Sequence, residues 1–243
     1  PCITIVIQLC EMLLSLEEGV KSFSVSFSQT GSMIQDIVTA NVLRKMAKHY
    51  AEQIGCGDAM INLVYHQWMG AFPSNKDYSE SLINTSTVIA SMVRADKIIT
   101  KTRDEAFGIP TRESNAKTVA NTQYTLRMLQ GIPNITDEQE EEIVTSEVMS
   151  IMEAVFNDKA DTLWRKVFNS IKSGIIDVPY SPHIINHNEV VTVRDKNKNI
   201  RIIKKGNLPI SDRCFEYEKA QCDLNKDASS IVNDIIHDIG IMQ

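Results

Sequence analysis

The sequence predicts an α/β protein in which a parallel sheet is followed by a mostly helical region with one β-hairpin. Two observations predict the sheet. Short apolar runs alternate with longer stretches of helical periodicity, and the apolar runs end in loops rich in polar and turn-forming residues. Strands that alternate with helices favour parallel pairing. A third observation, the acidic and Met-rich stretch after Pro133, predicts the change to helices.

Three βα units are predicted before Pro133. Apolar residues recur at helical spacing in the longer stretches, and residues 23–27 (Phe-Ser-Val-Ser-Phe) alternate strictly, as a half-buried strand does. The predicted order is helix 2–18, strand 23–27, helix 33–54, strand 60–65, helix 77–94, strand 97–100 and helix 112–130. Three strands do not close a barrel, which needs eight and typically about 250 residues. These units are therefore either an open sheet or the later part of a barrel.

The region after Pro133 is predicted to be helical apart from one hairpin. Residues 136–139 (Thr-Asp-Glu-Gln) resemble a capping box at the start of a helix that runs to about residue 157. Two apolar runs joined by Asp195-Lys-Asn-Lys-Asn199 predict a hairpin. The remaining predicted elements are a helix over about 161–173, hairpin strands 190–194 and 200–204, and a closing helix at 227–239.

Composition restricts the function classes. Of the 243 residues, 43% are hydrophobic and the net charge is −6, which argues against a nucleic-acid or anionic-membrane surface. No apolar run reaches the roughly 18–20 residues of a membrane span. The five cysteines form no CxxC pair, which favours reduced thiols in the cytoplasm and no metal site. The chain opens on Pro1 without an initiator Met, so we expect it to be cut from a longer protein.

The loops that follow the three strands are the predicted site. Right-handed crossovers place residues 28–32, 66–73 and 100–110 at one edge of the sheet, where ligands of parallel α/β proteins bind. Lys101 and Glu105 are four residues apart, so they point the same way if the loop enters a helical turn. Such a pair suits a ribose diol. The alternative is a surface ion pair that contributes less than about 1 kcal/mol.

Apolar side chains in the second loop offer a surface for a ring system. Trp68, Met69 and Phe72 present flat or polarizable groups suited to an adenine or a large macrocycle. The alternative for these side chains is ordinary core packing. His66, at the end of its strand, is either a ligand or a satisfied structural histidine. Asp234 and His237 approach the Asp-x-His-x-x-Gly pattern of cobalamin-binding domains, but their spacing is one residue too long, so we expect no cobalt coordination.

Five segments of the chain carry a family resemblance: Ser28 to Ile37, His66 to Pro73, Gly108 to Asn115, Gly174 to Tyr180 and Gly206 to Ile210. Together they resemble the large (epsilon) subunit family of methylaspartate mutase, also called glutamate mutase. The resemblance extends over nearly the whole chain.

This resemblance implies a (β/α)8 TIM barrel. Residues 1–132 would be the C-terminal part of the barrel, its later βα units, and residues 133–243 a helical and hairpin C-terminal region. By motif, Lys101 and Glu105 would hold the ribose of adenosylcobalamin, and Met69, Phe72 and Ile109 would line the cofactor cavity. The implied reaction is the radical interconversion of L-glutamate and (2S,3S)-3-methylaspartate. The implied partner is a small cobalamin-binding subunit in a hetero-oligomer.

The sequence also departs from the family pattern. Ser32 stands where Asn is usual, and residues 102–104 (Thr-Arg-Asp) stand where Thr-Pro-His is usual. No residues match the arginines with which the family binds its amino-acid substrate, so the chain is expected to supply the cofactor side of the site, with no catalytic residue assigned. The alternatives are a non-catalytic barrel partner that docks a cobalamin subunit, and a related mutase acting on a different acid.

Overall fold

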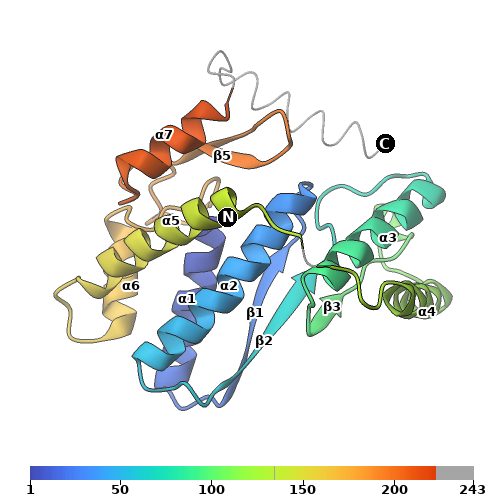
Figure 1. Cartoon of the computed structure of the whole chain (residues 1–243), viewed down its shortest axis with the longest axis horizontal. Helices are drawn as coiled ribbons and strands as arrows, with labels where there is room; N and C mark the ends of the chain where they lie inside the picture. The colour runs from blue at the N-terminus through green and yellow to red at the C-terminus, as the bar shows by residue number, and fades with distance from the viewer. Residues whose placement is uncertain (134, 223–243) are drawn as a thin grey trace.

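A computed structural model describes residues 1–133 and 135–222. It is an α/β structure in which helices cover a small sheet and a hairpin lies beyond the upper ends of the strands (Figure 1). The elements are α1 (Cys2–Glu17), β1 (Ser22–Ser28), α2 (Met33–Gln53), β2 (Met60–His66), α3 (Lys76–Met92), β3 (Lys97–Ile99), the 3-10 turn η1 (Glu105–Phe107), α4 (Arg112–Met128), α5 (Glu138–Phe156), α6 (Leu163–Lys172), β4 (Val191–Arg194), β5 (Ile200–Lys204) and α7 (Asp212–Ala220).

The sheet has the order β1-β2-β3, and both pairings are parallel. Ser22 pairs with Met60 at one end of β1, and Ser28 pairs with His66 at the other. The short β3 pairs only with the last part of β2, from Val64 to His66. The prediction of three adjacent parallel strands is confirmed, and their carboxyl ends meet at one edge.

The prediction that residues 1–132 are part of a (β/α)8 barrel is wrong. The described residues form an open three-stranded sheet and a separate two-stranded hairpin, and β1 and β3 each pair with β2 alone within that part of the chain. A closed barrel requires pairing on both edges of every strand. Apolar periodicity predicts where a strand lies, but it carries no information on how many strands adjoin it.

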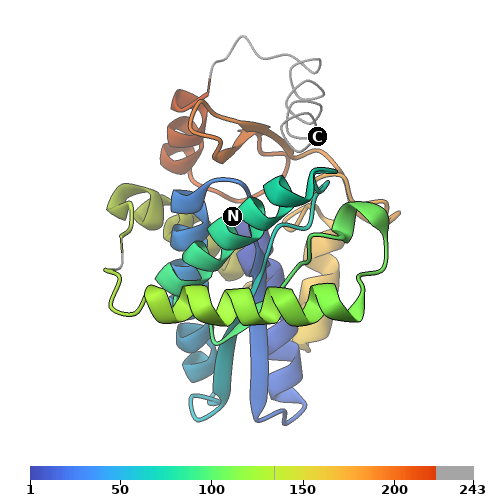
Figure 2. The same ribbon diagram turned by 90° about the vertical axis from the view of Figure 1, so that its right-hand side faces the viewer.

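Alternation within the strands places one face of the sheet in the core. Val25 and Phe27 of β1 and Leu63 and Tyr65 of β2 are at most 3% exposed, and the rings of Phe27 and Tyr65 lie 5.2 Å apart. Helices α1 and α2 pack on this face, and α5 packs across both of them (Figure 1). Helix α4 packs against α3 and lies nearest the viewer in Figure 2. The opposite face leaves Met60 of β2 63% exposed.

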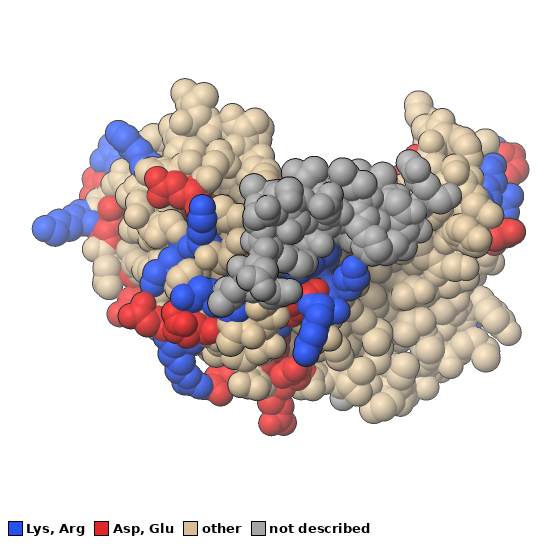
Figure 3. Space-filling view, turned by 90° about the horizontal axis from the view of Figure 1, so that it is seen from above, with Lys and Arg blue, Asp and Glu red and all other residues tan. Residues whose placement is uncertain are grey.

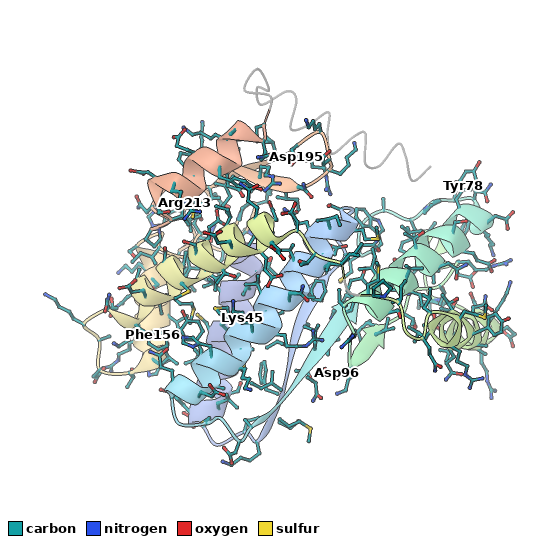
Figure 4. The ribbon with its side chains drawn as sticks, viewed as in Figure 1. Lys45, Tyr78, Asp96, Phe156, Asp195 and Arg213 are labelled. Carbon is teal, nitrogen blue, oxygen red and sulfur yellow. The ribbon has the colours of Figure 1, made fainter. Side chains whose placement is uncertain are left out.

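The hairpin and α7 are attached by a buried ion cluster. Arg201 of β5 contacts the carboxylates of Glu140 (2.7 Å), Asp195 (2.9 Å) and Glu218 (3.4 Å), which come from α5, the hairpin turn and α7. All four side chains are at most 3% exposed, and Asp195 lies at the turn end of the hairpin in Figure 4. No element was predicted at residues 212–220. A local signal for α7 is its N-cap Ser211, which accepts a hydrogen bond from Cys214 N.

The closing helix predicted at 227–239 lies outside the described residues, as do Asp234 and His237. No helix in the described part of the chain combines the length and apolar character needed to cross a membrane.

Candidate functional site

Two of the three predicted loops surround a cavity at the carboxyl edge of the sheet. Its volume is about 330 Å³, and it lies between the loop after β2 and the loop after β3. The lining residues are Trp68, Met69, Gly70, Ala71, Phe72, Lys101, Glu105 and Ala106. The structure thus brings four of the five residues singled out from the sequence around one cavity: Met69, Phe72, Lys101 and Glu105.

Lys101 and Glu105 form the polar wall of this cavity. The loop enters the 3-10 turn η1 at Glu105, which brings Lys101 Nζ within 3.4 Å of Glu105 Oε2. Glu105 Oε1 also accepts a hydrogen bond from Thr102 N at 3.3 Å, so the carboxylate is oriented by the backbone of its own loop. The two side chains are only 23% and 22% exposed. A carboxylate and an ammonium so placed keep capacity to bind a pair of ligand hydroxyls.

The opposite wall is aromatic. Trp68 Nε1 donates a hydrogen bond to Ala71 O at 2.9 Å, which folds the loop around the indole. Gly70 leaves room for the indole in this position, because a Cβ at residue 70 would lie 2.7 Å from Cζ2 of Trp68. Phe72 is half-buried, while Met69 is 58% exposed and accepts a hydrogen bond from Ser28 Oγ at its sulfur. The cavity therefore has a flat apolar side and a charged side.

Ile109, the fifth residue singled out, does not line this cavity. It is 98% exposed and borders a neighbouring cavity of about 490 Å³ between the amino-terminal ends of α3 and α4. Ion pairs tie this part of the loop to α3, from Asp104 to Lys76 at 3.0 Å and from Arg103 to Glu80 at 3.1 Å. Lys76 holds the pKa of Asp104 down at about 2.

Two titratable groups near the carboxyl ends of the strands have shifted pKa values. Partial burial and the nearby Lys101 lower the pKa of His66, which favours a neutral imidazole at neutral pH. Asp36, at the start of α2, is completely buried, and burial raises its pKa to about 7 against the hydrogen bonds from Thr30 N and Oγ1. Neither residue lines the 330 Å³ cavity. Within the described residues no group of three or more His, Cys, Asp or Glu side chains could hold a metal ion.

Sequence reasoning did not single out Gln29 and Gln67, which the structure places behind the cavity walls. Each is the first residue after a strand, and their side chains are 9% and 1% exposed. The available signal was the same residue type at the same place after β1 and β2.

Seen from above, charged side chains gather over the hairpin and α7 on the left, and the described surface over α3 and α4 on the right is mostly uncharged (Figure 3).

Comparison with known proteins gives one consistent result. Residues 1–230 match the model of a family described as methylaspartate mutase E chain (MutE). The glutamate mutase epsilon subunit of Treponema denticola is 34% identical over 225 residues, which cover 91% of this chain and 46% of that protein. The glutamate mutase epsilon subunit of Escherichia coli O157:H7 is 33% identical, with 98% of this chain and 51% of that protein covered. The chain thus spans about half the length of the curated relatives it matches.

Proposed function

The chain belongs to the methylaspartate mutase E chain family, and from that premise we propose that it supplies the cofactor side of a glutamate mutase. The reaction would be the interconversion of L-glutamate and (2S,3S)-3-methylaspartate, with adenosylcobalamin as the cofactor. The observation that carries the proposal is the cavity in which the Lys101–Glu105 pair faces Trp68 and Phe72.

The cavity fits the adenosyl group of this cofactor. Its volume of about 330 Å³ lies at the lower end of the range of roughly 300–1,000 Å³ for small-molecule sites. That size suits a nucleoside and is too small for a corrin ring, which would lie outside it. The ribose hydroxyls match the Lys101–Glu105 pair, and the adenine ring matches the flat faces of Trp68 and Phe72.

When bound, adenosylcobalamin supplies the radical chemistry of the reaction. The residues of this chain bind and orient the adenosyl group. Glu105 accepts hydrogen bonds from ribose hydroxyls, and Lys101 donates to the same oxygens while neutralising Glu105. The apolar side chains of Trp68 and Phe72 exclude water from the adenosyl group, which limits side reactions. No catalytic residue is assigned to the chain.

The proposed partner is a small cobalamin-binding subunit. The relatives are named as epsilon subunits of glutamate mutase, which supports an assembly of more than one kind of chain. Exposed apolar side chains at the rim of the loops support a contact surface there, because Met69, Phe107 and Ile109 are 58%, 61% and 98% exposed. Tyr78, at the outer end of α3 in Figure 4, is also exposed, at 59%.

A chimera tests the proposal. This chain would replace the matching part of the Treponema denticola epsilon subunit, and mutase turnover would be measured with the cobalamin-binding subunit and adenosylcobalamin. We expect cofactor-dependent turnover that falls on Lys101→Ala. A folded chimera that captures the cobalamin subunit without turnover, and whose Lys101→Ala variant behaves identically, would favour a non-catalytic docking role instead.

A further inference from the structure

Gln29 and Gln67 occupy the same place after successive strands. Gln29 follows β1, and its backbone N–H donates to the carbonyl of His66, the last residue of β2. Gln67 follows β2, and its N–H donates to the carbonyl of Ile99, the last residue of β3. These bonds, of 3.0 and 3.2 Å, continue each strand pairing by one residue, so each glutamine side chain lies beside the loop of the next strand.

The side-chain carbonyl of each glutamine holds the backbone of that next loop. Gln29 Oε1 accepts a hydrogen bond from Trp68 N at 3.1 Å. Gln67 Oε1 accepts one from Lys101 N at 2.8 Å. Trp68 begins the aromatic wall of the cavity and Lys101 begins its charged wall. Each wall therefore begins at a residue whose backbone N–H donates a hydrogen bond to the side chain of a buried glutamine.

Helix α3 holds the two glutamines in turn. Ser86 donates a short hydrogen bond to Gln29 Oε1. Gln67 Nε2 donates to Thr87 Oγ1 at 3.1 Å and to Ile83 O at 3.3 Å. Ser86 and Thr87 are consecutive residues and both are completely buried. Buried polar groups without partners are costly, so this arrangement admits few alternatives for either loop.

We propose that Gln29 and Gln67 are positioning residues for the adenosyl site, an inference that rests on the proposed function. Gln29 fixes the position of the loop that carries Trp68 and Phe72. Gln67 fixes the position of the loop that carries Lys101 and Glu105. Neither glutamine lines the cavity, so each acts through the loop that it holds.

Amide hydrogen exchange on the full chain tests the positioning directly. Methionine has the length of glutamine but offers no amide acceptor, so Gln67→Met should speed exchange about 10-fold at Lys101 and leave Trp68 unchanged. Gln29→Met should do the reverse. Gln35→Met is the matched control, because Gln35 is equally buried and bridges the backbone N–H and C=O of Ile200 in the hairpin. It should change neither amide. Equal acceleration of both amides by all three variants would overturn the inference.

Binding of 5′-deoxyadenosine separates this inference from the proposed function. Gln67→Met should weaken binding about 10-fold relative to Gln35→Met at matched thermal stability. Gln67→Glu should restore most of the affinity at about pH 5, where a buried glutamic acid is neutral and keeps its carbonyl acceptor. Unchanged affinity in Gln67→Met would overturn the inference. If the wild-type chain does not bind 5′-deoxyadenosine but the selective exchange pattern is found, the proposed function falls and the positioning of the two loops stands.

Discussion

Replacement of Glu105 by glutamine is the sharpest test of the cavity, because it separates binding from stability. The substitution removes the charge and preserves shape and one acceptor oxygen. Lys101 Nζ lies 3.4 Å from the carboxylate, and the two side chains are 23% and 22% exposed. An ion pair of this kind contributes at most about 1 kcal/mol to folding, which corresponds to roughly 2–4 °C in melting temperature for a chain of this size.

The expected effect on ligand binding is larger. A hydrogen bond between a charged group and a ribose hydroxyl in a partly desolvated cavity contributes about 1.5–3 kcal/mol. Because each 1.36 kcal/mol corresponds to a factor of ten, affinity for 5′-deoxyadenosine should fall about 10- to 150-fold. Lys101→Ala should produce a loss of the same order. Both variants would be measured by calorimetric titration of the full chain, with melting temperatures taken on the same samples.

The control is an ion pair with the same spacing away from the cavity. Arg165 and Asp161 are also four residues apart, with their charged atoms 2.9 Å apart at the start of α6. Asp161→Asn should leave affinity for 5′-deoxyadenosine unchanged and shift the melting temperature no more than Glu105→Gln does. Wild-type affinity in both Glu105→Gln and Lys101→Ala would refute the reasoning and reduce the pair to a surface contact.

Three further predictions concern Asp36, Arg201 and Gly70. Folding raises the pKa of Asp36 from 3.8 to about 7, so the stabilisation from its protonated carboxyl is complete below about pH 4 and is lost as the pH rises towards 7. The free energy of unfolding of Asp36→Asn, measured by urea titration, should therefore rise relative to that of the wild type between pH 5 and 8, by at most about 4 kcal/mol. Arg201→Met leaves buried carboxylates such as Glu140 without their cation and should cost about 3–5 kcal/mol in the same assay; a cost below about 1 kcal/mol would contradict it. Gly70→Ala should displace the Trp68 indole, seen as a shift in its fluorescence in a Trp164→Phe background, without a large change in melting temperature.

The sequence predicted most of the local structure because periodicity and capping are local properties. The parallel pairing of residues 22–28, 60–66 and 97–99 followed from strand–helix alternation. The prediction of a barrel rested on the family resemblance and not on the pattern of these residues. The number of strands in a sheet depends on long-range pairing, which no local pattern encodes. Helix α7 was missed because it has nine residues, and its attachment through Glu218 to Arg201 joins positions 17 residues apart.

In the candidate site, too, local contacts were predictable from the sequence and long-range contacts were not. The spacing of Lys101 and Glu105 was sufficient to predict that the two side chains meet, since four residues make about one helical turn. The link from Gln29 to Trp68 spans 39 residues and depends on the register of β1 against β2. Ile109 was grouped with the cavity by motif, yet the structure turns its side chain into solvent on the far part of the same loop.

Helix α3 is the common support of the site, although it contributes no residue to the lining of the 330 Å³ cavity. Its buried hydroxyls hold the glutamines after β1 and β2, and Ser79 Oγ donates to the carbonyl of Pro73 at the end of the aromatic loop. Its exposed first turns hold the loop after β3 through the charges of Lys76 and Glu80. Both loops that form the walls are thus fixed to α3 through buried glutamines, and ion pairs hold the loop after β3 in addition. A movement of α3 relative to the sheet would therefore displace both walls of the cavity together, whereas a change in any one of these bonds would displace only the loop that it holds.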